Sequence, residues 1–159
     1  LLLSIFIMAP VFAEMNEVAY QPYVNEELTT EEALEAASVP LKKFMLKQTS
    51  QDDLDFFIDL AKIEEPEGGF TEEYVQTELS LTVIVPSFMI SELKRAFQMG
   101  FMIFIPFLIL DLVVGSTLMS MGMMMLPPAM ISMPFKILVF VLADGWNLLI
   151  GSVVSSYNW

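Results

Sequence analysis

Apolar and polar residues are segregated along the chain. Residues 1–12 are apolar, residues 14–78 are largely polar, and residues 79–159 are apolar again with few charges. Twelve apolar residues are too few to cross the about 30 Å hydrocarbon core of a bilayer. They fit the end of a truncated membrane helix, or the core of a signal peptide with Ala9 or Ala13 near its cleavage site. Truncation is favoured because no charged region precedes them.

The polar segment predicts short helices. Thr29 and Glu32 have the spacing of a capping box. Pro40 suits the first turn of a following helix, where its missing N–H costs nothing. A third helix fits Ser50 to Lys62, and its acidic residues are expected to point mostly outward: Asp52, Asp53, Asp55 and Asp59. This acidic run lacks the central Gly and terminal Glu of a calcium loop, which favours a solvated helix face over a metal site.

The apolar segment predicts a helical hairpin. Residues 79–90 are apolar, rich in β-branched residues and interrupted by Pro86. Propensity therefore does not decide whether they form a strand or a kinked helix. Residues 96–126 would form a helix of about 46 Å, which is enough to cross a bilayer core. Pro127 and Pro128 are expected to stop that helix. A Met-rich bend at 121–128 and a second helix then follow.

Composition sharpens the division. The chain has 159 residues and a net charge of −13, and 17 of its 20 acidic residues lie between positions 14 and 78. The mean hydropathy is nevertheless +0.63. We therefore predict an all-α fold in three segments: the end of a hydrophobic helix at 1–13, an acidic helical extramembrane module at 14–78, and membrane-protein-like helical hairpins at 79–159.

Missing residue types exclude several functions. The chain has no Cys and no His, which removes disulfides, thiolate nucleophiles, Ser-His-Asp catalysis and the common zinc sites. Net acidity without a stripe of Lys and Arg argues against nucleic-acid binding. No phosphate loop or acid–base pair is visible, so we expect no enzyme activity and no cofactor.

Two charges in the apolar segment are expected to meet. Asp111 and Lys136 have their sequence midpoint at 123.5, inside the Met-rich bend, so a chain reversal there places both about 19 Å from the tip. A charge in apolar surroundings usually faces a partner, and we predict a salt bridge. It would act either as a clasp that fixes the helix register, which we favour, or as part of an ion or proton pathway.

The bend is also rich in methionine. Met123, Met124 and Met125 are consecutive, and Met119 and Met121 lie just before them. Thioether side chains adapt to objects of variable shape, so they could form a soft hydrophobic constriction in a pore. Ordinary packing at a helix end is the simpler interpretation, and composition alone favours it.

Further charges lie where the long helix is expected to begin. Glu92 would gain about 0.3–1 kcal/mol from the helix dipole there. This leaves Lys94 and Arg95 unexplained, and an intersubunit ion pair is the alternative. Asp111 and Asp144 would differ by about eight residues in height by the same reversal, which is poor geometry for a proton-sharing protease dyad.

Several stretches are shared with one protein family. They are Pro-Leu-Lys-Lys-Phe-Met-Leu-Lys-Gln-Thr (40–49), Ser-Glu-Leu-Lys-Arg-Ala-Phe-Gln (91–98), Phe-Ile-Pro-Phe-Leu-Ile-Leu-Asp (104–111), Met-Gly-Met-Met-Met-Leu-Pro-Pro (121–128), Pro-Phe-Lys (134–136) and Asp-Gly-Trp-Asn (144–147). With these stretches the chain resembles the FliP family of flagellar export-gate subunits, which is related to the SctR subunits of injectisomes.

The resemblance implies a structural role. Several copies, a pentamer in the family, would assemble with FliQ and FliR into a ring around an export conduit that docks on the FlhA/FlhB machinery. Met123, Met124 and Met125 would form a gasket that seals the conduit until an unfolded flagellar protein passes. The ring would lie in the bacterial inner membrane at the flagellar basal body, with the acidic module in the periplasm.

The resemblance also assigns the charges. Asp111 and Lys136 match paired intramembrane charges, and Glu92 matches an acidic position used in subunit contacts, with Lys94 and Arg95 beside it. The leading hypothesis is thus a pore subunit with a deformable Met seal. The alternative is an ion- or proton-coupled transporter that uses Asp111, Lys136 and Glu92 as relay groups.

Overall fold

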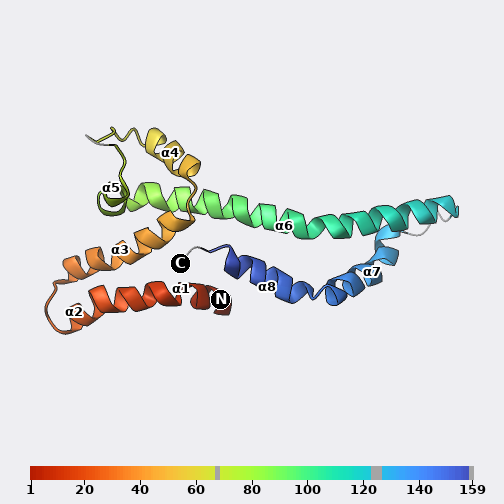
Figure 1. Cartoon of the computed structure of the whole chain (residues 1–159), viewed down its shortest axis with the longest axis horizontal. Helices are drawn as coiled ribbons and strands as arrows, with labels where there is room; N and C mark the ends of the chain where they lie inside the picture. The colour runs from red at the N-terminus through yellow and green to blue at the C-terminus, as the bar shows by residue number, and fades with distance from the viewer. Residues whose placement is uncertain (67–68, 123–126, 158–159) are drawn as a thin grey trace. The chain divides into compact units, whose positions relative to one another are not determined.

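Every regular element in the described part of the chain is a helix (Figure 1), which confirms the predicted all-α fold. The structure is a computed structural model that describes residues 1–66, 69–122 and 127–157. These residues form two compact units. The first comprises Leu1–Lys94 together with Tyr157, and the second comprises Arg95–Ser156.

An apolar helical stretch opens the first unit. Helix α1 (Leu2–Met15) continues through the π-helical turn η1 (Asn16–Tyr20) into α2 (Gln21–Val24). Pro22 has no N–H for the Val18 carbonyl, and its ring would clash with that carbonyl in a regular α-helix. The wider π turn lies directly before this proline, which fits a local accommodation of it. The stretch Leu2–Val24 is thus longer than the predicted hydrophobic segment.

Helix α3 (Thr30–Gln48) begins as predicted and continues further than predicted. Thr29 accepts a hydrogen bond from the Glu32 N–H, and the Glu32 carboxylate accepts one from the Thr29 N–H, which completes the capping box. Pro40 does not start a new helix, because it lies buried inside α3. Pro40 also lines one small pocket together with Val11 of α1 and Phe44.

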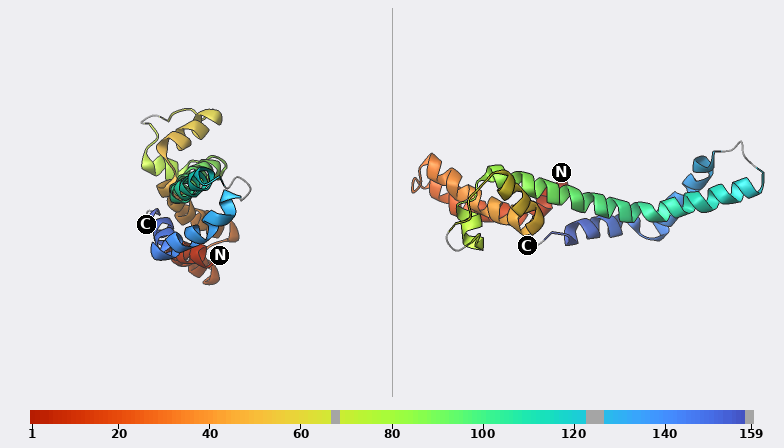
Figure 2. Two further views of the ribbon diagram at one scale, coloured as in Figure 1. Left: turned by 90° about the vertical axis from the view of Figure 1, so that its right-hand side faces the viewer. Right: turned by 90° about the horizontal axis from the view of Figure 1, so that it is seen from above.

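The core of the first unit joins segments that the sequence separates. Helix α4 (Gln51–Leu60) and the short α5 (Glu72–Thr77) complete it, and α1 lies beside α3 (Figure 2). The buried apolar side chains come from α1, α3, α4, α5, the connection after α5 and the start of α6, and they are Ile7, Val11, Phe44, Met45, Leu54, Ile58, Val75, Leu79, Val83 and Ile84. The acidic module therefore shares one core with apolar helices on both sides of it in sequence.

Helix α6 (Leu81–Ser120) settles the open interpretation of residues 79–90, because its first turns are helical despite Pro86. The helix ends before the predicted double proline. Gly122 adopts a φ of +74°, a backbone conformation that glycine tolerates best, and its N–H bonds the Met119 carbonyl. The prolines start the next helix instead, since α7 (Pro128–Leu142) has Pro127 as its N-cap.

The second apolar helix is broken, which the sequence analysis did not predict. Helix α7 ends at Leu142 and α8 (Gly145–Ser155) continues at 61° to it. Asp144 lies between them in the left-handed region, with φ 51°. A Cβ on Gly145 would lie 2.4 Å from the Phe140 ring, so this position requires glycine.

Among the described residues, two helical stretches are long and apolar enough to cross a membrane: Leu2–Val24 and Leu81–Ser120. The bent pair α7 and α8 would make a third if it forms one broken span. Most large apolar side chains of the second unit are exposed, including Phe97, Phe101, Leu112 and Leu142. A surface of this kind is stable only against lipid or another protein. The chain is therefore a membrane protein by its helices.

Candidate functional site

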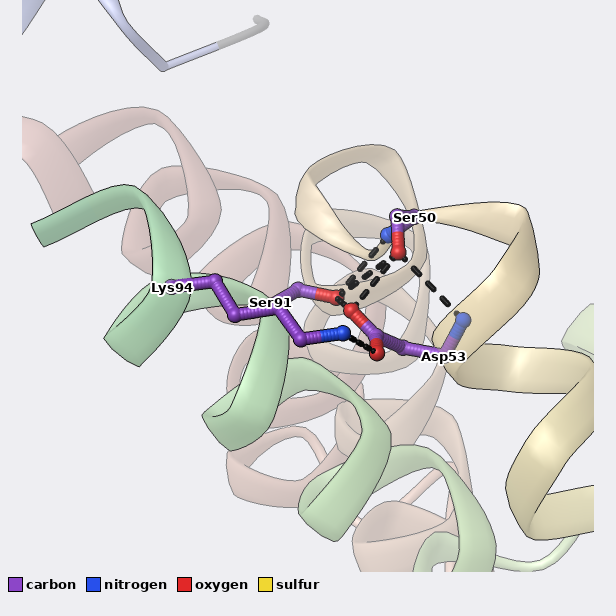
Figure 3. Close-up of polar contacts among 4 residues, drawn as sticks. All are labelled: Ser50, Asp53, Ser91 and Lys94. Carbon is purple, nitrogen blue, oxygen red and sulfur yellow. Dashed lines mark hydrogen bonds and ion pairs between the residues drawn. The ribbon is translucent and has the colours of Figure 1, made fainter. Parts of the chain in front are cut away.

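A buried carboxylate network lies in the first unit (Figure 3). Ser50 caps α4, and its hydroxyl donates to the Asp53 Oδ2 atom at 2.7 Å. The hydroxyl of Ser91, on α6, donates to the same oxygen at 2.7 Å. Lys94, one turn further along α6, pairs with Asp53 Oδ1. Both carboxylate oxygens are thus engaged, and two helices are joined across about 40 residues of sequence.

Charge compensation keeps Asp53 ionised. The hydrogen bond from Lys94, followed by those from Ser50 and Ser91, lowers the pKa of Asp53 from 3.8 to about 2, although burial opposes the shift. The Asp53 side chain is only 7% exposed, whereas that of Lys94 is 62% exposed. The buried partner is therefore the carboxylate, and the lysine reaches it from the surface.

The network corrects two expectations. Asp53 was expected to point outward with its neighbours on α4, but it is buried, because hydroxyl groups and an ammonium from α6 satisfy it. Glu92 is not near a helix N-terminus, since α6 begins at Leu81, so the dipole interpretation is wrong. A signal for Asp53 was present: the Ser-x-x-Asp spacing of 50–53 and the Ser-x-x-Lys spacing of 91–94 each place two polar groups on one helix face.

The other residues predicted to contact subunits lie in different surroundings. Lys94 binds Asp53 of its own chain, and Arg95 donates from Nη1 to the Ser156 carbonyl at 3.4 Å. Lys94 and Arg95 therefore each have a described partner within their own chain. Their role between subunits stays a prediction.

A second carboxylate network lies between α6 and α7 in the second unit. Lys136 Nζ is 2.6 Å from Asp111 Oδ2, and the Ser132 hydroxyl donates to Asp111 Oδ1 at 2.5 Å. Asp111 lies nine residues before the end of α6, and Lys136 lies eight residues after the start of α7. The helices thus bring the two charges to similar depth in the hairpin.

The surroundings of Asp111 are open. Its side chain is 33% exposed and that of Lys136 is 24% exposed, while Ser132 is fully buried. Met123, Met124 and Met125 belong to the segment between these helices and lie outside the described residues. Across residues 1–66, 69–122 and 127–157, no three acidic side chains gather as a metal ion would need.

The sequence profile of the FliP family matches residues 1–153. The chain belongs to the FliP family. This confirms the resemblance inferred from the motifs. Similar relatives are all named "Flagellar biosynthetic protein FliP": the Bacillus subtilis protein is 54% identical, the Caulobacter vibrioides protein 52% and the Aquifex aeolicus protein 48%.

The FliP-family match extends over nearly all of this chain but not over all of its relatives. The alignments cover 99% of the chain in each case, and 68%, 57% and 64% of the three relatives in the same order. The aligned range of this chain contains the residues of both carboxylate networks.

Proposed function

We propose that the chain is a structural subunit of the flagellar type III protein-export gate. Its family supports this role, because relatives of 48–54% identity are named flagellar biosynthetic proteins. The subunit forms the export channel with copies of itself and with FliQ and FliR. It docks on the FlhA/FlhB machinery and passes unfolded flagellar proteins.

The observation that carries the proposal is the apolar hairpin of α6 and α7. Its outer side chains are exposed, so the isolated chain leaves them to be covered by lipid and neighbouring subunits. The segment that connects the two helices contains Met123, Met124 and Met125. Three adjacent thioethers at such a connection suit a deformable seal, because they close around cargo of different shapes.

The paired state of Asp111 favours a structural subunit over the transporter alternative. A relay carboxylate must exchange its partner during each cycle, whereas Asp111 has Lys136 on one oxygen and Ser132 on the other. We infer that this network is a clasp that holds α7 against α6 in the membrane.

The seal is tested by replacing Met123, Met124 and Met125 with alanine in a flagellated strain that lacks its own gene of this family. The unmodified gene should restore swimming. The triple variant should assemble but let ions and small solutes leak through the membrane, measured as membrane depolarisation. The matched control replaces Met89, Met99 and Met102 of α6 and should not leak. An assembled triple variant without leakage contradicts the gasket.

The placement of the acidic module in the periplasm has a simple test. The chain has no cysteine, so Glu35→Cys in α3 creates a single thiol on an exposed surface. A maleimide that does not cross the inner membrane should label it in intact cells with a permeable outer membrane. Labelling only after the inner membrane is disrupted would place the module in the cytoplasm.

A further inference from the structure

Ser50, at the turn between α3 and α4, uses both its N–H and its hydroxyl within the Asp53 network. The Ser50 N–H donates to the Ser91 Oγ atom at 3.0 Å, and the Ser50 hydroxyl donates to Asp53 Oδ2 while accepting from the Asp53 N–H at 3.3 Å. Ser91 therefore both accepts from the cap of α4 and donates to its buried carboxylate. Such closed networks hold their members in one arrangement.

We propose that Ser50, Asp53, Ser91 and Lys94 form a permanent clasp within one chain, in which Asp53 is the positioning residue that holds α4 on α6. Lys94 is thereby committed to its own subunit, and contacts between copies are made by other residues. The clasp joins the acidic module to the helix that enters the apolar segment. This proposal rests in part on the proposed function, because one of the experiments that test it measures swimming.

Burial and charge support the assignment to one chain. Asp53 is nearly inaccessible, and the groups that satisfy both of its oxygens are supplied by the same chain. An ion pair between copies would have to open this network and leave the carboxylate buried without its ammonium, which is costly. The Lys94 side chain is largely exposed, but its ammonium group is already paired with Asp53 of the same chain.

The serines allow a direct test by disulfide formation. Their hydroxyl oxygens are 3.4 Å apart, and cysteine is close to serine in size, so Ser50→Cys with Ser91→Cys should form an intramolecular disulfide on mild oxidation. Mass spectrometry should show most of the monomer lighter by two hydrogen atoms. Ser50→Cys with Ser80→Cys is the control, because Ser80 lies about 16 Å before Ser91 along the helix and is out of reach.

Mixing the two single variants decides whether the network lies within a chain. When Ser50→Cys and Ser91→Cys are carried by different copies in one cell, a clasp within each chain predicts loss of the disulfide. A covalent dimer at the yield of the double variant would overturn the proposal. The absence of both species, with each variant folded, would also overturn it, since the serines would not meet at all.

Function is tested in the same strain. Cells with the oxidised double variant should swim as well as after reduction, because a permanent clasp does not need to open. If oxidised cells do not swim and a reductant restores their swimming, α4 must leave α6 during function. That result would overturn the proposal that the clasp is permanent. Lys94→Arg should keep swimming and Lys94→Met should lose most of it, since only the former retains the ion pair. Equal swimming of both variants would contradict the role of the charge.

The experiments distinguish a failure of the Asp53 clasp from a failure of the proposed function. If the unmodified gene does not restore swimming, the proposed function is wrong, but the oxidation experiment still reports on the clasp. If the unmodified gene restores swimming and the intrachain disulfide does not form, only the clasp is wrong.

Discussion

Asp53 and Asp111 are held by the same chemistry in two different settings. Each accepts hydrogen bonds from a serine hydroxyl and a lysine ammonium on another helix. Asp53 lies in the unit with the packed core and is 7% exposed, whereas Asp111 lies on helices whose apolar side chains are mostly open and is 33% exposed. The first unit therefore buries Asp53 with its own side chains, whereas the second unit leaves Asp111 partly exposed.

The difference in burial decides where the strength of each ion pair comes from. The Asp53 carboxylate is already buried by its own chain, so the contribution of its network can be measured on the protein alone. The strength of the Asp111 pair depends on what covers α6 and α7, because a low dielectric strengthens the attraction and also raises the cost of leaving one charge unpaired. We therefore expect the largest effects of substitution at Asp111, once the hairpin is covered.

The largest expected effect is the loss of one charge from the Asp111 pair. Lys136→Met should destabilise the protein in membranes or detergent more than any single substitution in the first unit, because it leaves the Asp111 carboxylate without its partner. Adding Asp111→Asn should recover part of this loss. Urea unfolding measures both. Asp144→Asn is the control, since this exposed carboxylate is in the same unit, and additive losses in the double variant would contradict coupling.

The Asp53 network should respond to substitution and to acid. Asp53→Asn should cost about 1.5–3 kcal/mol, as expected for hydrogen bonds to a charged group. Because the pKa of Asp53 is lowered to about 2 in the folded protein, its stabilisation is fully present above the ordinary value of 3.8 and is lost as the pH falls towards 2.

The measurement is unfolding free energy against pH. The unmodified protein should lose stability relative to Asp53→Asn between these two pKa values. Asp52→Asn, at an exposed position in the same turn, should keep the profile of the unmodified protein. Parallel profiles for the unmodified protein and Asp53→Asn would contradict the assignment.

The bend between α7 and α8 should respond to a single methyl group. Gly145→Ala should cost about 1–3 kcal/mol, because the new Cβ would overlap the Phe140 ring and force the bend to move. Gly151→Ala, whose Cβ would meet nothing within 4 Å, should be neutral or stabilising. Thermal unfolding distinguishes them. Equal shifts of both variants would show that the bend does not depend on this contact.

The smallest effect is expected at the start of α3. Thr29→Ala should cost about 1 kcal/mol, because it removes the side-chain oxygen that accepts from the Glu32 N–H. Thr30→Ala, one residue inside the helix, is the control. Hydrogen exchange in the first turn should rise only for Thr29→Ala. An unchanged rate there would mean that the core, and not the cap, holds this end of the helix.

Much of the fold follows from local sequence, and its exceptions have physical causes. The capping box at Thr29, the helical hairpin and the opposition of Asp111 to Lys136 were all predicted, and the charged atoms of the last two residues lie 2.6 Å apart. The reversal of the chain explains this agreement, since α6 ends and α7 starts almost symmetrically about the predicted midpoint. Helix α6 ends at Ser120, before the predicted stop at the double proline, because Gly122 already takes the left-handed conformation that terminates a helix.

Local sequence is enough to predict the all-α class, the cap at Thr29, the segregation of acidic from apolar residues and the family. These depend on residues a few positions apart, where backbone propensity and side-chain spacing act directly. Three features become visible only in the folded chain: Pro40 stays inside a helix, α7 bends into α8, and Asp53 is buried. Each of these is unfavourable locally, and each is stabilised by groups distant in sequence or by contacts that form only when helices pack.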